Sequence, residues 1–492
     1  MAGLRRIWSR SKAFRVALVA VLAYTLLRLA VQGLFLAVML LPDKSVMGGL
    51  PERAGAEGPM LPVDLQLYVE AAERLWARQN LYPVWDRIEI YQYSPAFALA
   101  FRPFLWLPSD GSIAVVHTLL HIVAYGLLYL CWGRIFRRLS LVRVEEAWAW
   151  TLPVWLLFSQ FWSDLGYLNV YIIVALLATL LIDAVLHERL GRSLLWLSIL
   201  LQVKPHWAFA AAVPLLLGRR RFFLKLMALA ALVYAGVAGA TMLTVGTSYG
   251  WAQYVDYFQL LYNMRRCFPW RGPSAPFLGY NHSITQIVVY LLGLSPATLR
   301  LGTGVKILLL MPIAGVSLGH LFRPVRSVGY EVPRLSLDFA FALYLGVFIW
   351  MDMVWELSLG IAVFVYLLGT LARRNARAWV CVVFLPYALL DLWRLVSLAL
   401  SALGLEVIAP GPYVLTDPAI YVPLVMFVIL TFYALLVRRL WGALVCRCPE
   451  WCTLLTHMGG GVSALGSRAR DRVLNAGFRG EGLTTGRAER SV

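Results

Sequence analysis

Long apolar runs separated by short charged loops constrain this chain more than any other feature. A helix needs roughly 20 apolar residues to cross a bilayer, and runs of that order recur between residues 16 and 440. Side chains are 60% hydrophobic and only 14% charged, far from the composition of a soluble domain. Because backbone groups in lipid must hydrogen bond within the protein, the pattern predicts an all-α, polytopic membrane protein.

The net charge of +18 follows from the arrangement of the apolar runs. Lys and Arg residues gather in short loops beside these runs, as the bias of positive charge toward the cytoplasmic side predicts. We therefore expect the lipid bilayer, and no nucleic acid, as a partner; binding of anionic headgroups is the alternative for part of the charge. The run 16–41 is too long for a signal-peptide core, so the basic N-terminus is predicted to be cytoplasmic.

The apolar runs predict about twelve transmembrane helices. They fall near residues 16–41, 111–133, 147–162, 168–186, 194–203, 207–217, 224–245, 299–322, 336–350, 354–371, 378–400 and 419–440. Loop 42–110, with nine acids and six bases, is predicted to lie outside and to carry amphipathic interfacial helices, and 284–294 is expected to be a further one. Residues 1–440 form the predicted membrane domain. Residues 441–492 are a basic tail, predicted to be disordered and cytoplasmic.

One basic residue interrupts the apolar pattern. Lys204 and Pro205 separate two runs that are each too short to cross. Two shortened spans meeting there would keep the flanking arginines on one side, whereas one kinked span is the alternative. A lysine at membrane depth suggests an anionic partner or a water-filled cavity; the other interpretation is a side chain that extends to the interface.

Asp64 opens a segment with helical periodicity. Apolar side chains at Leu65, Val69, Ala72 and Trp76 predict an amphipathic helix with Asp64 as its N-cap. The carboxylate is a candidate general base, or it only caps the helix. The charge pattern places one set of polar residues on the same side of the membrane: Asp64, Asp164, Lys204, Asn281 and Asp352.

Arginines on the predicted outer side run against the charge trend. Arg265 and Arg266 precede the segment Cys267–Trp270, and they would bind a phosphate or contact lipid headgroups. The histidines show no metal-ligand spacing, so we expect no metal and no cofactor. The group Cys446, Cys448 and Cys452 is a loose set that suits reversible acylation or unmodified thiols.

Several short motifs occur in a recognisable order. They are Asp64-x-x-x-Tyr68-x-x-Ala71-Ala72, Asn80-Leu81-Tyr82, Tyr93-x-Pro95, Pro103-x-x-x-Leu107-Pro108, Gly166-x-x-Asn169, Lys204-Pro205 and Asn281-x-Ser283. Over residues 10–440 the chain resembles glycosyltransferase family 87, the polyprenol-phosphate-mannose-dependent mannosyltransferases and relatives that have the GT-C membrane fold.

The resemblance implies transfer of one sugar, with mannose the first expectation, from a polyprenyl-phosphate carrier. The acceptor would be a lipid-linked or polymeric glycan at the outer face of the cell membrane, and the anomeric carbon would be inverted. Asp64 matches the catalytic base of the family, and Lys204 would balance the charge of the leaving phosphate. The candidate substrate-binding residues are Lys204, Tyr68, Asn169, Asn281, Arg265, Arg266 and Asp352.

Two positions depart from the family pattern. Tyr167 stands where the family has Gln, and Trp350-Met351-Asp352-Met353 stands where many members have Trp-Asp-His-His. Without both histidines, the donor or acceptor could differ from that of the family, Asp352 or Glu356 could take over their polar role, or activity could be weak or lost. The donor sugar is therefore open. Two alternatives remain: a multi-span transporter or flippase of lipid-linked sugars, although no internal repeat is visible, and a protein-O-mannosyltransferase-like enzyme.

Overall fold

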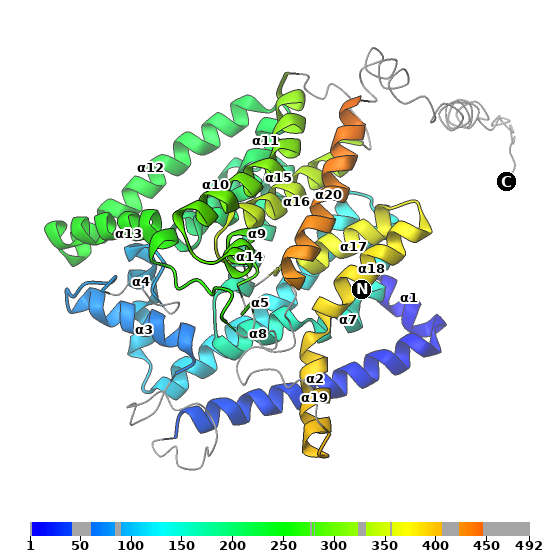
Figure 1. The fold of residues 1–492 in the computed structure, drawn as a ribbon, viewed down its shortest axis with the longest axis horizontal. Helices are drawn as coiled ribbons and strands as arrows, with labels where there is room; N and C mark the ends of the chain where they lie inside the picture. The colour runs from blue at the N-terminus through cyan, green and yellow to red at the C-terminus, as the bar shows by residue number, and fades with distance from the viewer. Residues whose placement is uncertain are drawn as a thin grey trace, which may run out of the picture. The chain divides into compact units, whose positions relative to one another are not determined.

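The computed structural model describes residues 2–41, 61–83, 90–275, 278–279, 281–322, 331–354, 357–405 and 423–445. Every regular element in these ranges is a helix (Figure 1), which confirms the all-α prediction. The chain divides into two compact units, Met1–Val437 and Arg438–Val492. The domain boundary near residue 440 stays a prediction, and the tail beyond Val445 lies outside the described ranges.

Five helices of the described ranges are long and apolar enough to cross a membrane. They are α2 (Lys12–Met39), α5 (Asp110–Arg138), α12 (Arg220–Val245), α15 (Pro296–Phe322) and α20 (Leu424–Val445). Two bent pairs raise the number to seven if each is one span: Leu152–Tyr167 with α9 (Tyr171–Leu186), bent by 119°, and α18 (Arg374–Ala388) with α19 (Leu390–Ala402), bent by 51°. The protein is therefore a multi-pass membrane protein, but the count of about twelve spans is not confirmed.

The difference in count arises because several predicted spans are short or broken helices. The region of the third prediction is divided into α6 (Val142–Trp150), α7 (Leu152–Leu157) and α8 (Ser159–Tyr167). Further short elements are α10 (Leu190–Val203), η3 (Pro205–Ala212), α11 (Val213–Leu216) and α17 (Gly360–Thr370), while α16 (Glu331–Trp350) has 20 residues. Proline is the first residue of η3 and the second residue of α7 and α11, and its missing N–H and fixed φ suit the first turn of a new helix.

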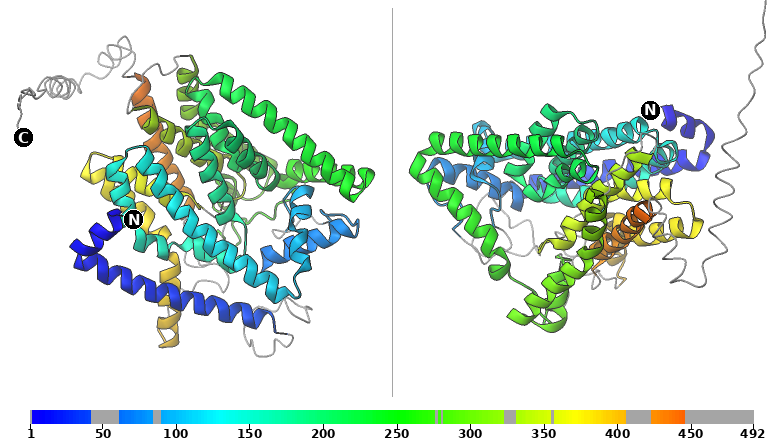
Figure 2. Two further views of the ribbon diagram at one scale, coloured as in Figure 1. Left: turned by 180° about the vertical axis from the view of Figure 1, so that it is seen from behind. Right: turned by 90° about the horizontal axis from the view of Figure 1, so that it is seen from above.

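The N-terminal helix α1 (Ala2–Arg10) leads into α2, and a buried ion pair joins α2 to α19. Arg28 Nε lies 3.0 Å from Asp391 Oδ2, and the two residues are 7% and 0% exposed. Tyr24 donates to the same carboxylate at 2.5 Å. Figures 1 and 2 show α19 crossing α2 from both sides. A charge inside an apolar helix is thus paired with a charge from far along the chain.

The first predicted outer loop contains α3 (Val63–Trp76), α4 (Pro95–Phe101) and η2 (Arg102–Trp106), and α3 packs on the other two. The helix predicted after Asp64 is confirmed, with Leu65, Val69 and Ala72 buried. Two details were wrong. Pro62 is the N-cap, so Asp64 lies in the first turn, where a negative charge favours the helix dipole. Trp76 is 55% exposed, because its ring lies under the Arg102 guanidinium and not in the core.

The segment that follows the predicted span 224–245, expected from the sequence to be an outer loop over 246–282, contains a long helix, α13 (Thr247–Cys267). Gly246 joins α12 to α13 with φ +106°, a conformation that favours glycine. At Gly250 a Cβ would lie 2.8 Å from the Met242 Cα, so glycine permits α13 to pack on α12. The helix predicted at 284–294 is present as α14 (Ile284–Leu292), and Ser283 caps it.

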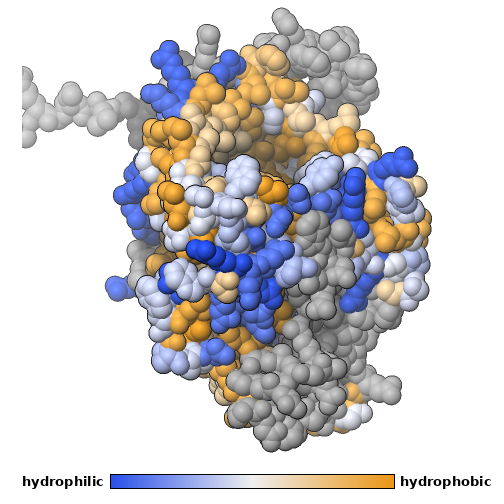
Figure 3. Space-filling view, turned by 90° about the vertical axis from the view of Figure 1, so that its left-hand side faces the viewer, coloured by the Kyte–Doolittle hydropathy of each residue, from blue (hydrophilic) through white to orange (hydrophobic). Residues whose placement is uncertain are grey.

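Figure 1 places α3, α4, α12 and α13 at the left of the ribbon. Figure 3 shows this face of the surface. Hydrophilic side chains gather across its middle, below a hollow. This face, to which α3 and α4 contribute, therefore carries a band of polar side chains.

Candidate active site

Two tyrosine hydroxyls meet on one asparagine close to Asp64. Tyr68 lies one helical turn after Asp64 and therefore on the same face of α3. Its hydroxyl is 2.8 Å from the Tyr93 hydroxyl and donates to Asn169 Oδ1 at 3.0 Å. Tyr93 reaches the same oxygen at 3.5 Å. We call Tyr68, Tyr93 and Asn169 the tyrosine cluster; all three are buried, and Asp64 beside them is partly buried.

Electrostatics keep both hydroxyls protonated. Burial raises the pKa of Tyr68 and of Tyr93 well above the ordinary value, and the negative charge of Asp64 raises both pKa values further. The hydroxyls therefore act as hydrogen-bond donors.

Asn169 is held in place by two buried residues, Asp164 and His121. Its backbone N–H donates to the Asp164 carbonyl at 3.1 Å, and the His121 ring contacts its carbonyl. His121 Nε2 lies 3.3 Å from Asp164 Oδ2, which also accepts from the Ile172 N–H at 2.9 Å. Asp164, placed by its sequence on the side of the candidate site, thus supports the tyrosine cluster and is itself fully buried.

Lys204 joins this group through a break in the chain. It ends α10 in an extended conformation, with φ −144° and ψ 90°, and η3 begins directly after it. Its Nζ lies 3.6 Å from the ring centre of Tyr171 and 5.1 Å from that of Tyr93. The predicted interruption at Lys204 is therefore present, and η3 packs against α10 and α9. Lys204 is thus linked through the Tyr93 ring to the tyrosine cluster, in which Tyr68 lies one helical turn after Asp64.

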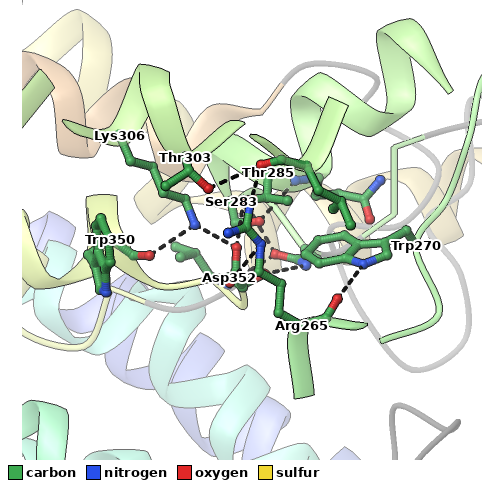
Figure 4. Close-up of polar contacts among 12 residues, drawn as sticks. Arg265, Trp270, Ser283, Thr285, Thr303, Lys306, Trp350 and Asp352 are labelled. Atoms are coloured by element: carbon green, nitrogen blue, oxygen red, sulfur yellow. Dashed lines mark hydrogen bonds and ion pairs between the residues drawn. The ribbon is translucent and has the colours of Figure 1, made fainter. Parts of the chain in front are cut away.

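A second polar group surrounds Asp352 (Figure 4). Oδ1 of Asp352 lies 2.5 Å from Lys306 Nζ and accepts from Thr285 Oγ1 at 2.5 Å. Oδ2 lies 3.7 Å from Arg265 Nε. Lys306 also donates to the Trp350 carbonyl at 2.9 Å. We call Asp352, Lys306, Thr285 and Arg265 the Asp352 cluster; it joins α13, α14 and α15 to the turn that follows α16.

Asn281 builds the turn that carries Asp352. Its amide donates to the Asp352 carbonyl at 2.9 Å, and its Oδ1 accepts from the backbone N–H groups of Ser283 and Val354, at 3.1 and 3.0 Å. The N–H of His282 donates to the Val354 carbonyl at 2.6 Å. Asn281 is thus brought to Asp352, with its side-chain contacts made to backbone groups.

His282 fastens this segment to α20 in a pH-sensitive way. Its Nδ1 accepts from the Val425 N–H at 3.2 Å, and the residue is fully buried. Burial lowers the pKa of His282 to about 4, since a charged ring would lose its hydration and Nδ1 could no longer accept. Below the unfolded-state pKa of about 6.5, the unfolded chain takes up a proton that the folded chain does not. Stability is therefore lost as the pH falls from about 6.5 to about 4.

A contact between described residues links the two groups. Gln92 Nε2 lies 3.9 Å from Met353 Sδ, so the turn of Asp352 lies against the segment that carries Tyr93. Arg266 is exposed and its guanidinium lies over the Tyr262 ring at 5.8 Å. Within the described residues Arg266 contacts neither group, in contrast to its neighbour Arg265.

Sequence reasoning missed Lys306, Thr285, Tyr93 and Tyr171. Lys306 had a readable signal, because it is an ionisable residue inside the long apolar helix α15, and such residues mark functional or paired positions. Tyr93 had a weaker signal, as part of the motif Tyr93-x-Pro95, and Tyr171 had none, since aromatic residues are abundant in this chain. Among the described residues no group of three His, Cys, Asp or Glu could hold a metal ion. Glu356, Cys446, Cys448 and Cys452 lie outside the described ranges.

The fold and these clusters define an all-helical, multi-pass membrane protein with a carboxylate, a lysine and several tyrosines gathered in one site. The model of glycosyltransferase family 87 matches residues 91–349, which is more than half of the chain. The chain belongs to this family and is a membrane glycosyltransferase. No curated protein and no solved structure matches it. The matched range contains Asn169, Lys204 and Arg265, whereas Asp64 lies before it and Asp352 after it.

Proposed function

We propose that this protein transfers a sugar, with mannose the first candidate, from a polyprenyl-phosphate carrier to a lipid-linked or polymeric glycan. The observation that carries the proposal is the grouping of Asp64 and Lys204 around the tyrosine cluster. It supplies a proton acceptor and a cation from segments 140 positions apart. A glycosyl transfer from a lipid phosphate needs both, because one oxygen loses a proton while another gains negative charge.

The reaction balances with these groups alone. An acceptor hydroxyl gives its proton to the Asp64 carboxylate as its oxygen attacks the anomeric carbon of the donor. The bond between that carbon and the phosphate oxygen breaks, and the oxygen keeps the electron pair. The products are the new glycoside and polyprenyl phosphate, and a single displacement inverts the anomeric carbon.

Lys204 would stabilise the leaving phosphate. A fixed ammonium close to a developing oxyanion favours the transition state, most of all where water is scarce. Tyr68 and Asn169 would position Asp64 and the sugar through the tyrosine cluster. Arg265, Arg266 and Asp352 would bind anionic and hydroxyl groups of donor or acceptor, and Asn281 would hold the turn of Asp352. We propose no metal and no cofactor in this reaction.

The membrane orientation is part of the proposal. Basic residues flank the apolar helices at the N-terminus and at Arg373, Arg374 and Arg377, which favours the cytoplasm for these segments and for both termini. The loop that carries Asp64 would then face outward. Polyprenyl-phosphate sugars suit such a site, because the lipid holds the activated sugar at the membrane where nucleotide sugars are absent.

The test uses purified protein in lipid with a panel of labelled polyprenyl-phosphate sugars. Asp64→Asn should lower turnover by about 10²–10⁴-fold, the range for loss of a general base. Lys204→Met should lower it as well, with little change in folding. Glu70→Gln is the matched control, because Glu70 lies on the same helix and pairs with Arg74 at 3.2 Å; it should retain activity.

The outcomes separate the elements of the proposal. Turnover that depends on Asp64 and Lys204 would identify the donor and support the reaction. Full turnover of Asp64→Asn would remove that carboxylate from the chemistry. If folded wild-type protein turned over no donor but accumulated labelled lipid-linked sugar in sealed vesicles, the transferase proposal would fail in favour of transport.

A further inference from the structure

Two aromatic rings face the ammonium of Lys204. The Tyr171 ring centre is 3.6 Å from Nζ and the Tyr93 ring centre is 5.1 Å away. Both distances lie within the range over which a ring face attracts a cation. A ring attracts the ammonium through its quadrupole and adds no net negative charge to the site. The contact therefore orients the Lys204 ammonium.

Separate elements hold the two rings in place. Tyr171 is the first residue of α9, and the Asp164 carboxylate holds the first turn of this helix by accepting from the Ile172 N–H at 2.9 Å. Tyr93 stacks on Phe97 with ring centres 4.7 Å apart, and its hydroxyl contacts Tyr68. The two rings are therefore anchored before any substrate binds.

We propose that Tyr171 and Tyr93 are positioning residues that hold the Lys204 ammonium toward the phosphate of the lipid donor. This inference rests on the proposed function and deepens it, because it assigns roles to two residues outside the candidate site of the sequence. Tyr93 contacts both sides of the proposed site. Its ring faces Lys204, while its hydroxyl binds the cluster one turn from Asp64, so it fixes the separation of the proposed base and the proposed cation.

The prediction is that Tyr171 acts through Lys204. Tyr171→Leu removes the ring and should lower kcat/KM, and weaken binding of polyprenyl phosphate, by about tenfold. Tyr171→Phe keeps the ring face and should stay within about twofold of wild type. In a Lys204→Met background, Tyr171→Leu should cause no further loss, because coupled residues are not additive. Polyprenyl phosphate alone is the binding probe, so one readout does not need turnover.

Tyr125→Leu is the control for general damage. Tyr125 is also buried but stacks on Phe161, with ring centres 4.0 Å apart, and its ring contacts within the described residues do not include Lys204. Tyr125→Leu should lower kcat/KM by the same factor in the wild-type background and in the Lys204→Met background, as for independent sites.

Equal losses for Tyr171→Leu in both backgrounds would overturn the positioning role, and so would failure of Tyr171→Phe to retain activity. Either result would leave the proposed sugar transfer by the wild-type protein unaffected. A folded wild type that neither binds polyprenyl phosphate nor turns over any donor would overturn the proposed function together with this inference.

Discussion

Replacing Lys306 by methionine should loosen the turn that carries Asp352. The Lys306 side chain is only 3% exposed, and its ammonium lies 2.5 Å from Asp352 Oδ1. It also binds the Trp350 carbonyl at 2.9 Å. Methionine fills a similar volume in the apolar helix α15, so the main effect is the loss of charge and of two hydrogen bonds.

The stability lost in Lys306→Met depends on the groups that remain around the Asp352 carboxylate. Breaking a fully buried ion pair on one side costs about 3–5 kcal/mol. The Asp352 side chain is 27% exposed and keeps Thr285 and Arg265 as neighbours, so we expect a smaller loss, about 2 kcal/mol. Asp352→Asn leaves the more deeply buried ammonium of Lys306 without its carboxylate and should cost about 3 kcal/mol. The double variant removes both charges and should be more stable than either single variant.

Thermal unfolding in detergent, followed by intrinsic fluorescence, measures these differences. A loss of about 2 kcal/mol corresponds to a midpoint lower by a few degrees, on the order of 4 °C. Thr303→Ser, on the same helix, is a control that should change the midpoint little. Additive losses in the double variant would refute the reasoning, because they would show that Lys306 and Asp352 contribute independently.

Three further outcomes can be checked. Lowering the pH from about 7 to about 5 should cost about 2 kcal/mol of stability through His282, because its pKa is about 4 in the folded protein and about 6.5 in the unfolded chain. His282→Gln should flatten the plot of melting temperature against pH between these two values. A plot unchanged by the substitution would contradict this role of His282. Arg28→Leu should destabilise the protein by about 3–5 kcal/mol by leaving the buried Asp391 unpaired, and adding Asp391→Asn should recover most of the loss in the same melting assay. Tyr68→Phe removes one donor to Asn169 and should cost about 1 kcal/mol and lower initial rates several-fold; unchanged rates would place the hydroxyl outside the mechanism.

The fold class was predictable because it depends on composition and local order. Long apolar runs demand internally bonded backbone in lipid, and only helices and closed barrels provide it. The boundaries of α5 and α12 came close to the prediction for the same reason. The count of about twelve spans stays a prediction, since a short apolar helix can pack against other helices or form part of a broken span, and periodicity does not distinguish the two.

Part of the candidate site was predictable from chemistry at unusual positions. A lysine beside a proline between half-length apolar runs and an acid opening an amphipathic helix both stand out locally. Tyr68, one turn after Asp64, contacts Asn169 and Tyr93, and Lys204 lies over the Tyr93 ring. The partners of Asp352 could not be predicted, because Lys306, Thr285 and Arg265 come from three different helices. Tyr171 and Tyr93 could not be singled out as partners of Lys204, because the chain contains many other aromatic residues.

The sequence by itself determined that this chain folds as membrane helices, where its basic loops lie, and which charged residues interrupt its apolar runs. These properties follow from the solvation of each segment by water or lipid, which neighbouring residues decide. Only the tertiary structure decided that Arg28 pairs with Asp391, that Lys306 holds Asp352, and that Tyr171 and Tyr93 face Lys204. Each of these contacts joins residues far apart in the chain, and hydrogen bonds, ion pairs and ring contacts depend on distances of a few ångströms that only packing of the helices sets.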